Sequence, residues 1–434
     1  MDARRELDAG VRRERALRAA VGVAQEYGVN VGAARILEDW NDTIVHLAPA
    51  PLVARVRTTW LDGGEVDTLR REIAIAGHAA ARGAPVVEPS RDPPPGPHRF
   101  DNLTLTFWEY VETVPGDVPA REAGIALRRL HNAIDDYAGE LPPLSDRLDR
   151  AQRVADDPTA LQHPPENERQ FLAESLRSLR SRFEGFALAE RALHGGPHLA
   201  NLLRTPSGPR WIDLDTACVG PLEWDLAHLP ETAADAFAQV DPQALEEARL
   251  LVSAAVAVWC WRTYGRAPAV DNAARFHLGR LRMAAGELRI TTFADGHRDG
   301  FRSLVEDTLR EFGFEPDPEM DPDLEDPAGT YAALWVVLSG EQVVGSVALR
   351  DLGDGALELK RMYLRPEQRG LGLGKKLLAT AIDWAREHGA RVVKLDTSER
   401  METARALYDA HGFTRVPGYA PRQGQHRLLY ELRL

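Results

Sequence analysis

One stretch, Glu358–Lys375, constrains the fold more than any other part of the chain, and it reads ELKRMYLRPEQRGLGLGK. Its first half alternates as a strand does, and a helical pattern follows from Lys375 to His388. Glycines stand between them at positions 370, 372 and 374. Glycine lets the backbone come close to a ligand, and unpaired N–H groups at a helix N-terminus attract an anion. Because Arg369 and Lys375 add positive charge, this strand–loop–helix unit is predicted to bind a pyrophosphate.

The glycine spacing separates this loop from a Rossmann dinucleotide loop, which has G-x-G-x-x-G and an acidic residue about 20 residues further on. Here the order is R-G-x-G-x-G, after a strand that ends in Arg365-Pro366. This order resembles the acetyl-coenzyme A loop of the GNAT N-acetyltransferases. The likeness continues in the strand pattern of residues 391–396, in A-x-x-L-Y at 404–408 and in His411-Gly412-Phe413. It covers about residues 287–434 and implies the mixed-sheet GNAT acetyltransferase fold.

The resemblance implies that acetyl-CoA is the cofactor and that an amine attacks its thioester. Backbone groups of Met362, Tyr363 and Leu364 are then expected to pair with the pantetheine arm. The residues expected to hold the pyrophosphate are Arg369, Gly370, Leu371, Gly372, Leu373, Gly374 and Lys375.

Two residues are predicted to move protons. Strand alternation puts residues 358, 360 and 362 on one side and 359, 361 and 363 on the other, and Glu358 is the candidate general base. Tyr408 matches the GNAT tyrosine near the coenzyme sulfur, so the resemblance makes it the candidate general acid. The alternatives are an ordinary exposed strand carboxylate and a packed core aromatic. Many relatives carry an asparagine that contacts the coenzyme, and Thr397 or Ser398 is the candidate here.

An acidic segment, residues 315–326, reads EPDPEMDPDLED and holds seven acids in twelve positions. Its prolines prevent a regular helix. In the GNAT fold this segment is expected to border the acceptor site, where an acidic wall would attract a polyamine or an amino sugar. A solvated loop is the alternative.

A second set of motifs lies earlier in the chain: HGGPHLAN at 194–201, WIDLD at 211–215 and GPLEWDLA at 220–227. Together they resemble the aminoglycoside phosphotransferases, with H-G-D-x-H-x-x-N, then I-D, then G-P-x-x-x-D-L-A. The likeness covers about residues 20–284 and implies a bilobal, protein-kinase-like fold.

The phosphotransferase resemblance assigns a role to each matching position. Asn201 and Asp213 would hold Mg²⁺ if ATP or GTP binds, and His194 would brace the catalytic loop together with Asp225. The remaining matches are Arg55 at the position of the phosphate-binding lysine, Glu72 as its ion-pair partner, and Trp108–Val111 as the adenine hinge.

Two departures from the phosphotransferase pattern affect its chemistry. Gly196 replaces the catalytic aspartate and can neither accept a proton nor orient a hydroxyl. Arg55 replaces the lysine with a wide planar fork in place of a point charge. Asp215 stands beside the metal position and is a weak substitute for the missing base. Both an active kinase and a degenerate kinase fold that binds a small molecule or acts as a scaffold remain open.

Length and composition bound the remaining possibilities. A chain of 434 residues is expected to hold two or three domains, and we predict an α+β kinase-like domain at 1–286 and an α/β GNAT domain at 287–434. A net charge of −13 argues against nucleic-acid binding. No signal peptide is evident, and the longest apolar run, Leu250–Trp261, is too short to span a membrane. The two cysteines match no metal spacing. A cytoplasmic protein is expected, and its oligomeric state stays open.

Coarse periodicity gives the order of elements. We expect residues 1–34 to be helical in part, with an apolar stripe of Leu17, Ala20, Val21 and Ala24. The other predicted elements are strands at 43–47, 52–57 and 103–111, a helix at 65–82, mostly helices over 121–286, and alternating strands and helices over 287–434.

These observations predict an N-acetyltransferase that moves acetyl from acetyl-CoA to an amine of a small, cationic, antibiotic-like molecule. The first alternative is a bifunctional antibiotic-modifying enzyme that also uses ATP or GTP with Mg²⁺. The second is an N-terminal pseudokinase that binds ligand or regulates the transferase. A peptide or protein amine as acceptor is a third possibility.

Overall fold

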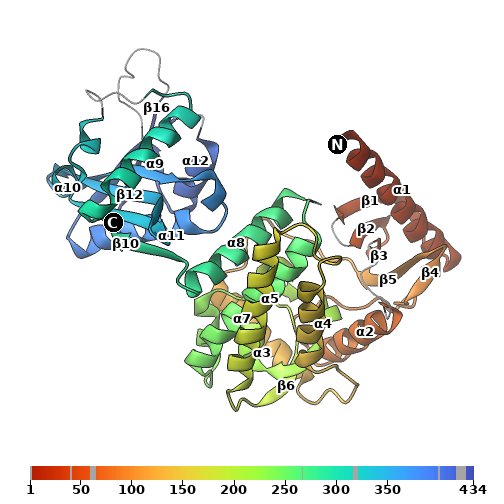
Figure 1. The fold of residues 1–434 in the computed structure, drawn as a ribbon. Coiled ribbons are helices and arrows are strands. Elements are labelled where there is room, and N and C mark those ends of the chain that lie inside the picture. Colours follow the sequence, from red (N-terminus) through yellow and green to blue (C-terminus); the bar gives the residue numbers. More distant parts are fainter. Residues whose placement is uncertain are drawn as a thin grey trace. The chain divides into compact units, whose positions relative to one another are not determined.

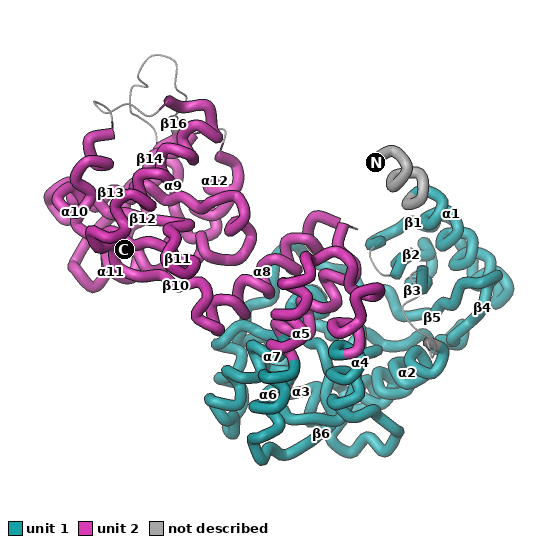
Figure 2. The backbone as a smooth tube through the Cα atoms, in the orientation of Figure 1, with its two compact units in different colours: residues 1–152, 177–252 teal, residues 153–176, 253–434 magenta. Residues whose placement is uncertain are grey.

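The chain forms two compact units in the structure, a computed structural model (Figures 1 and 2). The structure describes residues 2–39, 42–58, 65–265, 267–315, 321–398, 401–416 and 427–434. The first unit comprises residues 1–152 and 177–252, and the second comprises residues 153–176 and 253–434.

The division between the units passes through three helices: α4 (Leu144–Asp156), α5 (Glu166–Glu184) and α7 (Pro242–Arg262). The boundary predicted between residues 286 and 287 lies inside the second unit, which also contains α8 (Pro268–Ala284). The residue at which one domain ends and the next begins therefore stays a prediction.

A five-stranded antiparallel sheet begins the first unit, in the order β1-β2-β3-β5-β4. Its strands are β1 (Val31–Asp39), β2 (Asp42–Pro49), β3 (Leu52–Arg57), β4 (His98–Phe100) and β5 (Leu103–Glu109). Helix α1 (Asp2–Glu26) packs its apolar stripe against this sheet, and Ala20 and Ala24 are buried there with Phe107 of β5. Helix α2 (Glu65–Ala81) follows β3 and carries Glu72.

The first helix ends earlier than its periodicity suggests. Gly28 adopts a left-handed φ of 75°, and the N–H of Val29 donates to the carbonyl of Ala24 at 3.0 Å, which closes the helix. The expectation that residues 1–34 are helical in part is therefore confirmed for residues 2–26, whereas residues 31–34 begin β1, which was not predicted.

The remainder of the first unit is largely helical, with α3 (Ala120–Ile134), parts of α4, α5 and α7, and the short α6 (Leu222–Leu226). Two small ladders, which the periodicity did not predict, hold the motif loops. Strand β6 (Glu190–Leu193) pairs with β9 (Cys218–Pro221), and β7 (Leu202–Leu203) pairs with β8 (Arg210–Trp211). The HGG segment follows β6, and the WIDLD segment lies between β8 and β9. One-turn helices η1 (Leu199–Asn201), η2 (Leu214–Thr216) and η3 (Glu231–Ala236) complete this region.

A seven-stranded mixed sheet forms the centre of the second unit, in the order β10-β11-β12-β13-β14-β16-β15. Its strands are β10 (Leu288–Thr292), β11 (Ala333–Ser339), β12 (Gln342–Gly353), β13 (Ala356–Leu364), β14 (Val392–Ser398), β15 (Thr414–Val416) and β16 (Arg427–Arg433). Only β13 and β14 pair in parallel. This mixed sheet confirms the predicted fold class of the C-terminal region.

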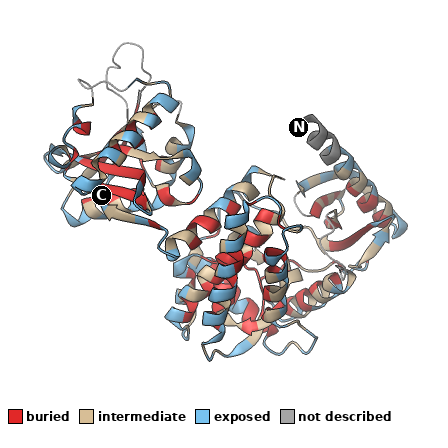
Figure 3. Cartoon of the chain, viewed as in Figure 1, coloured by how far each residue is buried: buried red, intermediate tan, exposed pale blue. Residues whose placement is uncertain are grey.

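Helices cover both faces of this sheet. Strand alternation puts Val337 of β11 in one core with α11 (Leu373–Glu387), and puts Val336 in another with Leu304 of α9 (Arg298–Glu311). Within this sheet, buried residues follow one another along β11 and β12 (Figure 3). The other helical segments are η4 (Asp295–His297), η5 (Pro322–Leu324), α10 (Pro327–Thr330), η6 (Pro366–Gln368) and α12 (Glu402–Ala410). Within the described part of the chain, no helix combines the length and apolar character needed to cross a membrane.

Candidate active site

The parallel ladder between β13 and β14 is short. It pairs residues 356–358 with residues 392–394, although the two strands continue to Leu364 and Ser398. Strand β14 pairs with β16 along its whole length on its other side, and β13 pairs with β12. Beyond Glu358, the edge of β13 that faces β14 therefore offers backbone groups to a ligand. This stretch includes Met362, Tyr363 and Leu364, the residues expected to meet the pantetheine arm.

A β-bulge at Arg361 changes the direction of the side chains in β13. Three residues of β13 span the same distance as two of β12, from the Ala348–Lys360 pair to the Ser346–Tyr363 pair. Arg361 has a φ of 50°, and the Ser346 hydroxyl donates to its carbonyl at 2.7 Å. This conformation is unusual for a side chain other than glycine and marks a constrained site.

The bulge reverses the alternation of side chains that the sequence predicts for β13. Met362 packs in the same core as Leu357 and Leu359, whereas Tyr363 packs in the core on the opposite face. The prediction that 358, 360 and 362 share one side is therefore wrong at Met362, because an extra residue at the bulge reverses the period-2 pattern.

The glycine loop follows β13 through η6 and turns into α11 as predicted. Gly370 and Gly372 adopt φ values of 80° and 79°, and Gly372 is the N-cap of α11. Leu371 and Leu373 are buried in the core, so they anchor the loop by their side chains and offer only backbone groups to a ligand. The N–H groups of Leu373, Gly374 and Lys375 belong to the first helical turn, which has no intrahelical acceptors. This arrangement fits the pyrophosphate of acetyl-CoA.

The two cations at the loop differ in their surroundings. Arg369 is paired with the carboxylate of Glu311, to which its Nη2 donates at 2.6 Å, and its Nε donates to the carbonyl of Leu364 at 3.0 Å. The hydrogen bonds from Arg369 lower the pKa of Glu311. Lys375 is exposed. Direct binding of phosphate by Arg369 stays a prediction, since its charge is already matched by a carboxylate.

Tyr408 lies in α12 and is 5% exposed. Its hydroxyl is 3.8 Å from the sulfur of Met362, next to the strand segment expected to bind the coenzyme. Burial raises the pKa of Tyr408 well above its usual range, and Tyr363 and Asp396 raise it further. The phenol is therefore protonated at neutral pH and has a proton to give. Its ring also packs in the core against Phe413 and Tyr430. Tyr408 is therefore a core aromatic as well as the candidate general acid.

Glu358 occupies the last paired position of the β13–β14 ladder, opposite Lys394. Its carboxylate forms an ion pair with Arg350 and lies 3.8 Å from Nζ of Lys360. Lys360 also reaches Asp396 of β14 at 3.5 Å. A general base needs a free lone pair directed at the amine, so catalysis by Glu358 requires release from these cations. Asp396, which lies near both Tyr363 and Tyr408, is a second carboxylate that the motifs did not point to.

The acidic segment has an internal cationic partner. Arg361 donates to Asp323 at 2.8 and 2.7 Å and to Asp321 at 2.7 Å, and the Tyr331 hydroxyl donates to Asp323 at 2.6 Å. Arg361 thus neutralises Asp321 and Asp323, two of the acids expected to form an acidic wall. Positions 316–320 lie outside the described residues. No sequence pattern predicts this pairing, because it joins residues about forty positions apart.

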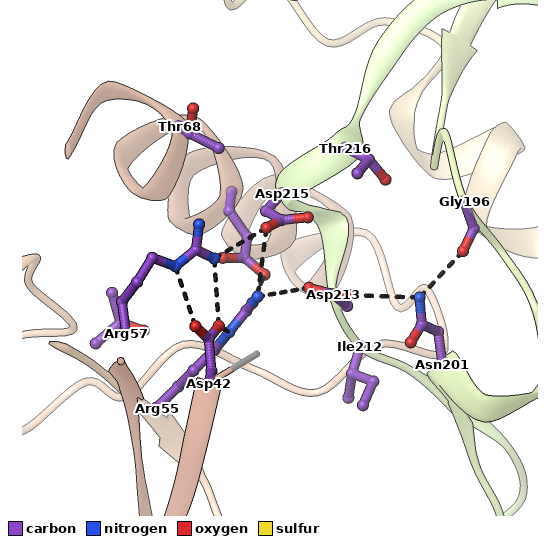
Figure 4. Close-up of polar contacts among 12 residues, drawn as sticks. Asp42, Arg55, Arg57, Thr68, Gly196, Asn201, Ile212, Asp213, Asp215 and Thr216 are labelled. Carbon is purple, nitrogen blue, oxygen red and sulfur yellow. Dashed lines mark hydrogen bonds and ion pairs between the residues drawn. The ribbon is translucent and has the colours of Figure 1, made fainter. Parts of the chain in front are cut away.

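Six charged side chains of the first unit form a dense cluster (Figure 4). We call it the Arg55 cluster, and its members are Asp42, Arg55, Arg57, Glu72, Asp213 and Asp215. Arg55 of β3 donates to Glu72 of α2 at 2.7 Å, which confirms the predicted pairing. Its second Nη donates to Asp213 at 2.6 Å and to Asp215 at 3.3 Å. One guanidinium therefore bonds both Glu72, the predicted ion-pair partner, and Asp213, the predicted metal ligand.

The rest of the Arg55 cluster closes around this guanidinium. Asp42 accepts hydrogen bonds from Nε of Arg55 and from Arg57 at 3.1 Å, and Arg57 reaches Asp215 at 3.0 Å. Burial raises the pKa of Asp213 to about 6, with Asp215 adding to the shift and Arg55 opposing it. Burial also acts to raise the pKa of Asp215, but Arg55 and Arg57 together lower it.

The surroundings of Asp213 do not fit Mg²⁺ as they are arranged. One carboxylate oxygen accepts from Arg55, and the other is 3.5 Å from the amide nitrogen of Asn201, which also donates to the carbonyl of Gly196 at 3.1 Å. Mg²⁺ requires oxygen ligands, whereas these neighbours are hydrogen-bond donors. Among the described residues, no group of three or more His, Cys, Asp or Glu side chains could hold a metal ion. Metal binding by Asn201 and Asp213 stays a prediction.

The position of the missing catalytic aspartate is enclosed by other groups. A Cβ atom at Gly196 would lie 3.2 Å from Oγ1 of Thr216 and 3.7 Å from Nη1 of Arg147. Arg147 donates to the carbonyl of Gly195 at 2.9 Å and lies over the ring of Trp224. No carboxylate occupies this position, and a guanidinium lies next to it.

His194 has a bracing role. Asp225 accepts the backbone N–H of His194 at 2.8 Å and that of Gly195 at 2.9 Å, and it also binds His131 at 2.8 Å. Nε2 of His194 is 3.1 Å from the carbonyl of Ile212, which ties the two motif loops together. Burial lowers the pKa of His194 to about 4, so the ring is neutral at physiological pH.

Comparisons with known proteins match the two regions separately. Residues 35–263 match the phosphotransferase enzyme family, and residues 299–413 match the acetyltransferase (GNAT) family. An uncharacterized N-acetyltransferase of Schizosaccharomyces pombe is 34% identical over 128 residues, which cover 28% of this chain and 78% of the relative. Human N-acetyltransferase 8B is 37% identical over 90 residues, which cover 20% of this chain and 40% of the relative.

Solved structures align with each region as well. A choline/ethanolamine kinase family protein of Mesorhizobium loti covers 62% of this chain and 93% of its own, at 16% identity and a TM-score of 0.46. A GNAT-family acetyltransferase of Staphylococcus aureus covers 34% of this chain and 98% of its own, at 22% identity and a TM-score of 0.31.

Removing the central guanidinium tests the Arg55 cluster. Arg55→Ala leaves buried carboxylates without their partner, and we expect a loss of about 3–5 kcal/mol in the free energy of unfolding. Arg70→Ala is the control, because the Arg70–Asp67 pair is 66% and 71% exposed, and its loss is expected to cost under about 1 kcal/mol. Urea unfolding followed by tryptophan fluorescence measures both. Equal effects of the two substitutions would contradict a central role for Arg55.

Proposed function

The chain belongs to the phosphotransferase enzyme family over residues 35–263 and to the GNAT acetyltransferase family over residues 299–413, and from this premise we propose a specific division of labour. The second unit transfers acetyl from acetyl-CoA to an amine of a small cationic molecule. The kinase-like region binds a ligand or regulates the transferase, and it does not transfer phosphate.

One observation carries the acetyl-transfer proposal. The β13–β14 ladder stops at Glu358, and the freed edge of β13 leads directly into the glycine loop and α11. A single continuous segment thus offers backbone groups for a pantetheine amide and then N–H groups for a pyrophosphate. The Tyr408 hydroxyl lies beside Met362 in the same segment.

The proposed mechanism assigns one task to each group. Acetyl-CoA supplies a thioester carbonyl, which the neutral acceptor amine attacks. Glu358 accepts the amine proton, directly or through water, once it is released from Arg350. Tyr408, which its raised pKa keeps protonated at neutral pH, donates a hydrogen bond and its proton to the thiolate as the carbon–sulfur bond breaks.

The acceptor class rests on charge and on analogy. A net charge of −13 and the acids of residues 315–326 favour a cationic acceptor. Arg361 neutralises Asp321 and Asp323, so attraction would come from the remaining acids of the segment. An antibiotic-like amine is our leading acceptor, because the region at 35–263 belongs to the phosphotransferase enzyme family and its motifs resemble those of the aminoglycoside phosphotransferases.

The bifunctional alternative is disfavoured by three features of the first unit. Gly196 provides no base, Arg147 lies next to that position, and Arg55 is bonded to Asp213 where a Mg²⁺ ligand is expected. A binding or regulatory role needs none of these groups to perform chemistry, so the geometry supports it better.

An acceptor screen tests the proposed activity. The purified full chain is incubated with acetyl-CoA and a panel of aminoglycosides, polyamines and peptide antibiotics, and the free thiol of released CoA is measured. We expect release with at least one polycationic amine and none with the N-acetylated form of the same compound. Thiol release with none of these amines would contradict the proposed acceptor class.

Substitution of the proposed acid tests the mechanism. Tyr408→Phe removes the hydroxyl but keeps the ring in its core position, and we expect kcat to fall by roughly ten- to ten-thousand-fold with little change in KM for acetyl-CoA. Steady-state kinetics on the responsive acceptor measure both values. An unchanged kcat would remove Tyr408 from the mechanism and leave it a core aromatic.

A further inference from the structure

Helix α8 lies between the two family matches, one of which ends at residue 263 while the other begins at residue 299. Neither match assigns it a role. Within the second unit, however, α8 contacts the glycine loop at three points. These contacts involve the same backbone that is expected to bind the coenzyme pyrophosphate.

The closest contact joins Gly279 of α8 to Leu371 of the loop. A Cβ atom at residue 279 would lie 2.5 Å from Cβ, 2.6 Å from the carbonyl oxygen and 2.8 Å from Cα of Leu371. Real Cβ atoms do not approach other atoms this closely, so the helix and the loop backbone can meet only because residue 279 is glycine. Leu371 is itself 5% exposed, which fixes the loop at this point from the other side.

The second and third contacts lie one turn earlier in α8. The ring of Phe276 lies 3.0 Å from where a Cβ of Gly372 would be, and the aliphatic part of Arg275 lies 3.6 Å from the corresponding position of Gly370. The Arg275 guanidinium bonds the Tyr264 hydroxyl and lies over that ring. The atoms of α8 closest to these two positions are therefore carbons. They influence where the loop backbone lies and place no charge beside it.

Helix α8 is well fixed at its C-terminal end. The N–H of Ala285 donates to Leu281 at 2.8 Å, and Met283 packs into the core that contains Leu288 of β10 and Leu371. Arg282 forms an ion pair with Glu168 of α5 at 3.3 Å. A helix held in this way can act as a rigid support for the loop it touches.

We propose that α8 is a positioning element of the coenzyme site, with Gly279 and Phe276 setting the backbone of the loop at Leu371 and Gly372. This inference rests on the acetyl-CoA use proposed above. A shift of the loop by a few tenths of an ångström misaligns the N–H groups that meet the pyrophosphate. Coenzyme affinity, rather than the chemical step, is then the quantity that α8 controls.

The test compares two helical glycines in the full chain. Gly279→Ala forces a Cβ against the Leu371 backbone, whereas Gly77→Ala in α2 is the matched control, because a Cβ there meets nothing within 4 Å. Titration calorimetry with free CoA measures the dissociation constant without any acceptor. We expect Gly279→Ala to weaken CoA binding about tenfold or more, and Gly77→Ala to leave it unchanged. An unaltered dissociation constant for a folded Gly279→Ala protein would overturn the inference.

A second variant and a kinetic readout keep the test decisive. Phe276→Ala removes the ring behind Gly372 without adding bulk, and we expect a several-fold weaker CoA affinity; if Gly279→Ala does not fold, this variant decides the question. With an active acceptor, KM for acetyl-CoA should rise while kcat and the acceptor KM stay unchanged. Wild-type protein that fails to bind CoA would defeat the proposed function itself. Wild-type binding together with unaltered variants would defeat only the role of α8.

Discussion

The hydrogen bonds of the Arg55 guanidinium are the interactions that hold together the charged cluster of the first unit. The guanidinium ties β3 to α2 through Glu72 and to the loop before β9 through Asp213 and Asp215. A largely buried cation among four carboxylates is destabilised strongly when a partner is removed. Phosphoryl transfer needs a divalent metal and free phosphate-binding donors in such a site. Here the neutralising charge is part of the protein, so the carboxylate expected to bind metal is already occupied.

In the second unit, the site results from departures from regular strand geometry. The bulge at Arg361 reverses the alternation of β13 and puts Met362 beside Tyr408. The early end of the β13–β14 ladder frees the backbone edge that leads to the glycine loop. Arg361 also holds Asp321 and Asp323, so the same bulge fixes one end of the acidic segment. The groups proposed to bind the coenzyme and to move protons are thus arranged around one irregular strand.

The sequence predicted those parts of the fold and site that depend on short local motifs. The glycine loop and the helix after it follow from spacing and residue type within a few positions. The Arg55–Glu72 pair and the expected place of His194 came from the resemblance to the phosphotransferases, because their partners lie 17 and 31 positions away. It did not predict β1, because Gly28 ends the first helix at a point that apolar periodicity does not mark.

The missed parts of the site are long-range charge pairings and one local irregularity. Glu311 pairs with Arg369, and Asp323 pairs with Arg361, across 58 and 38 positions of sequence. No pattern within a single segment encodes such partners. The bulge was not predicted because a period-2 pattern assumes a uniform strand. The contact between Gly279 and Leu371 was not predicted either, because the two residues are far apart in sequence.

The most direct test of the account is a pair of titrations on the same preparation of the full chain. Titration calorimetry with acetyl-CoA, and separately with ATP or GTP in the presence of Mg²⁺, compares the two potential sites. We expect saturable binding of acetyl-CoA and no Mg²⁺-dependent binding of either nucleotide, because Arg55 already pairs with Asp213. Saturable nucleotide binding that requires Mg²⁺ would contradict it and would return the bifunctional enzyme to first place.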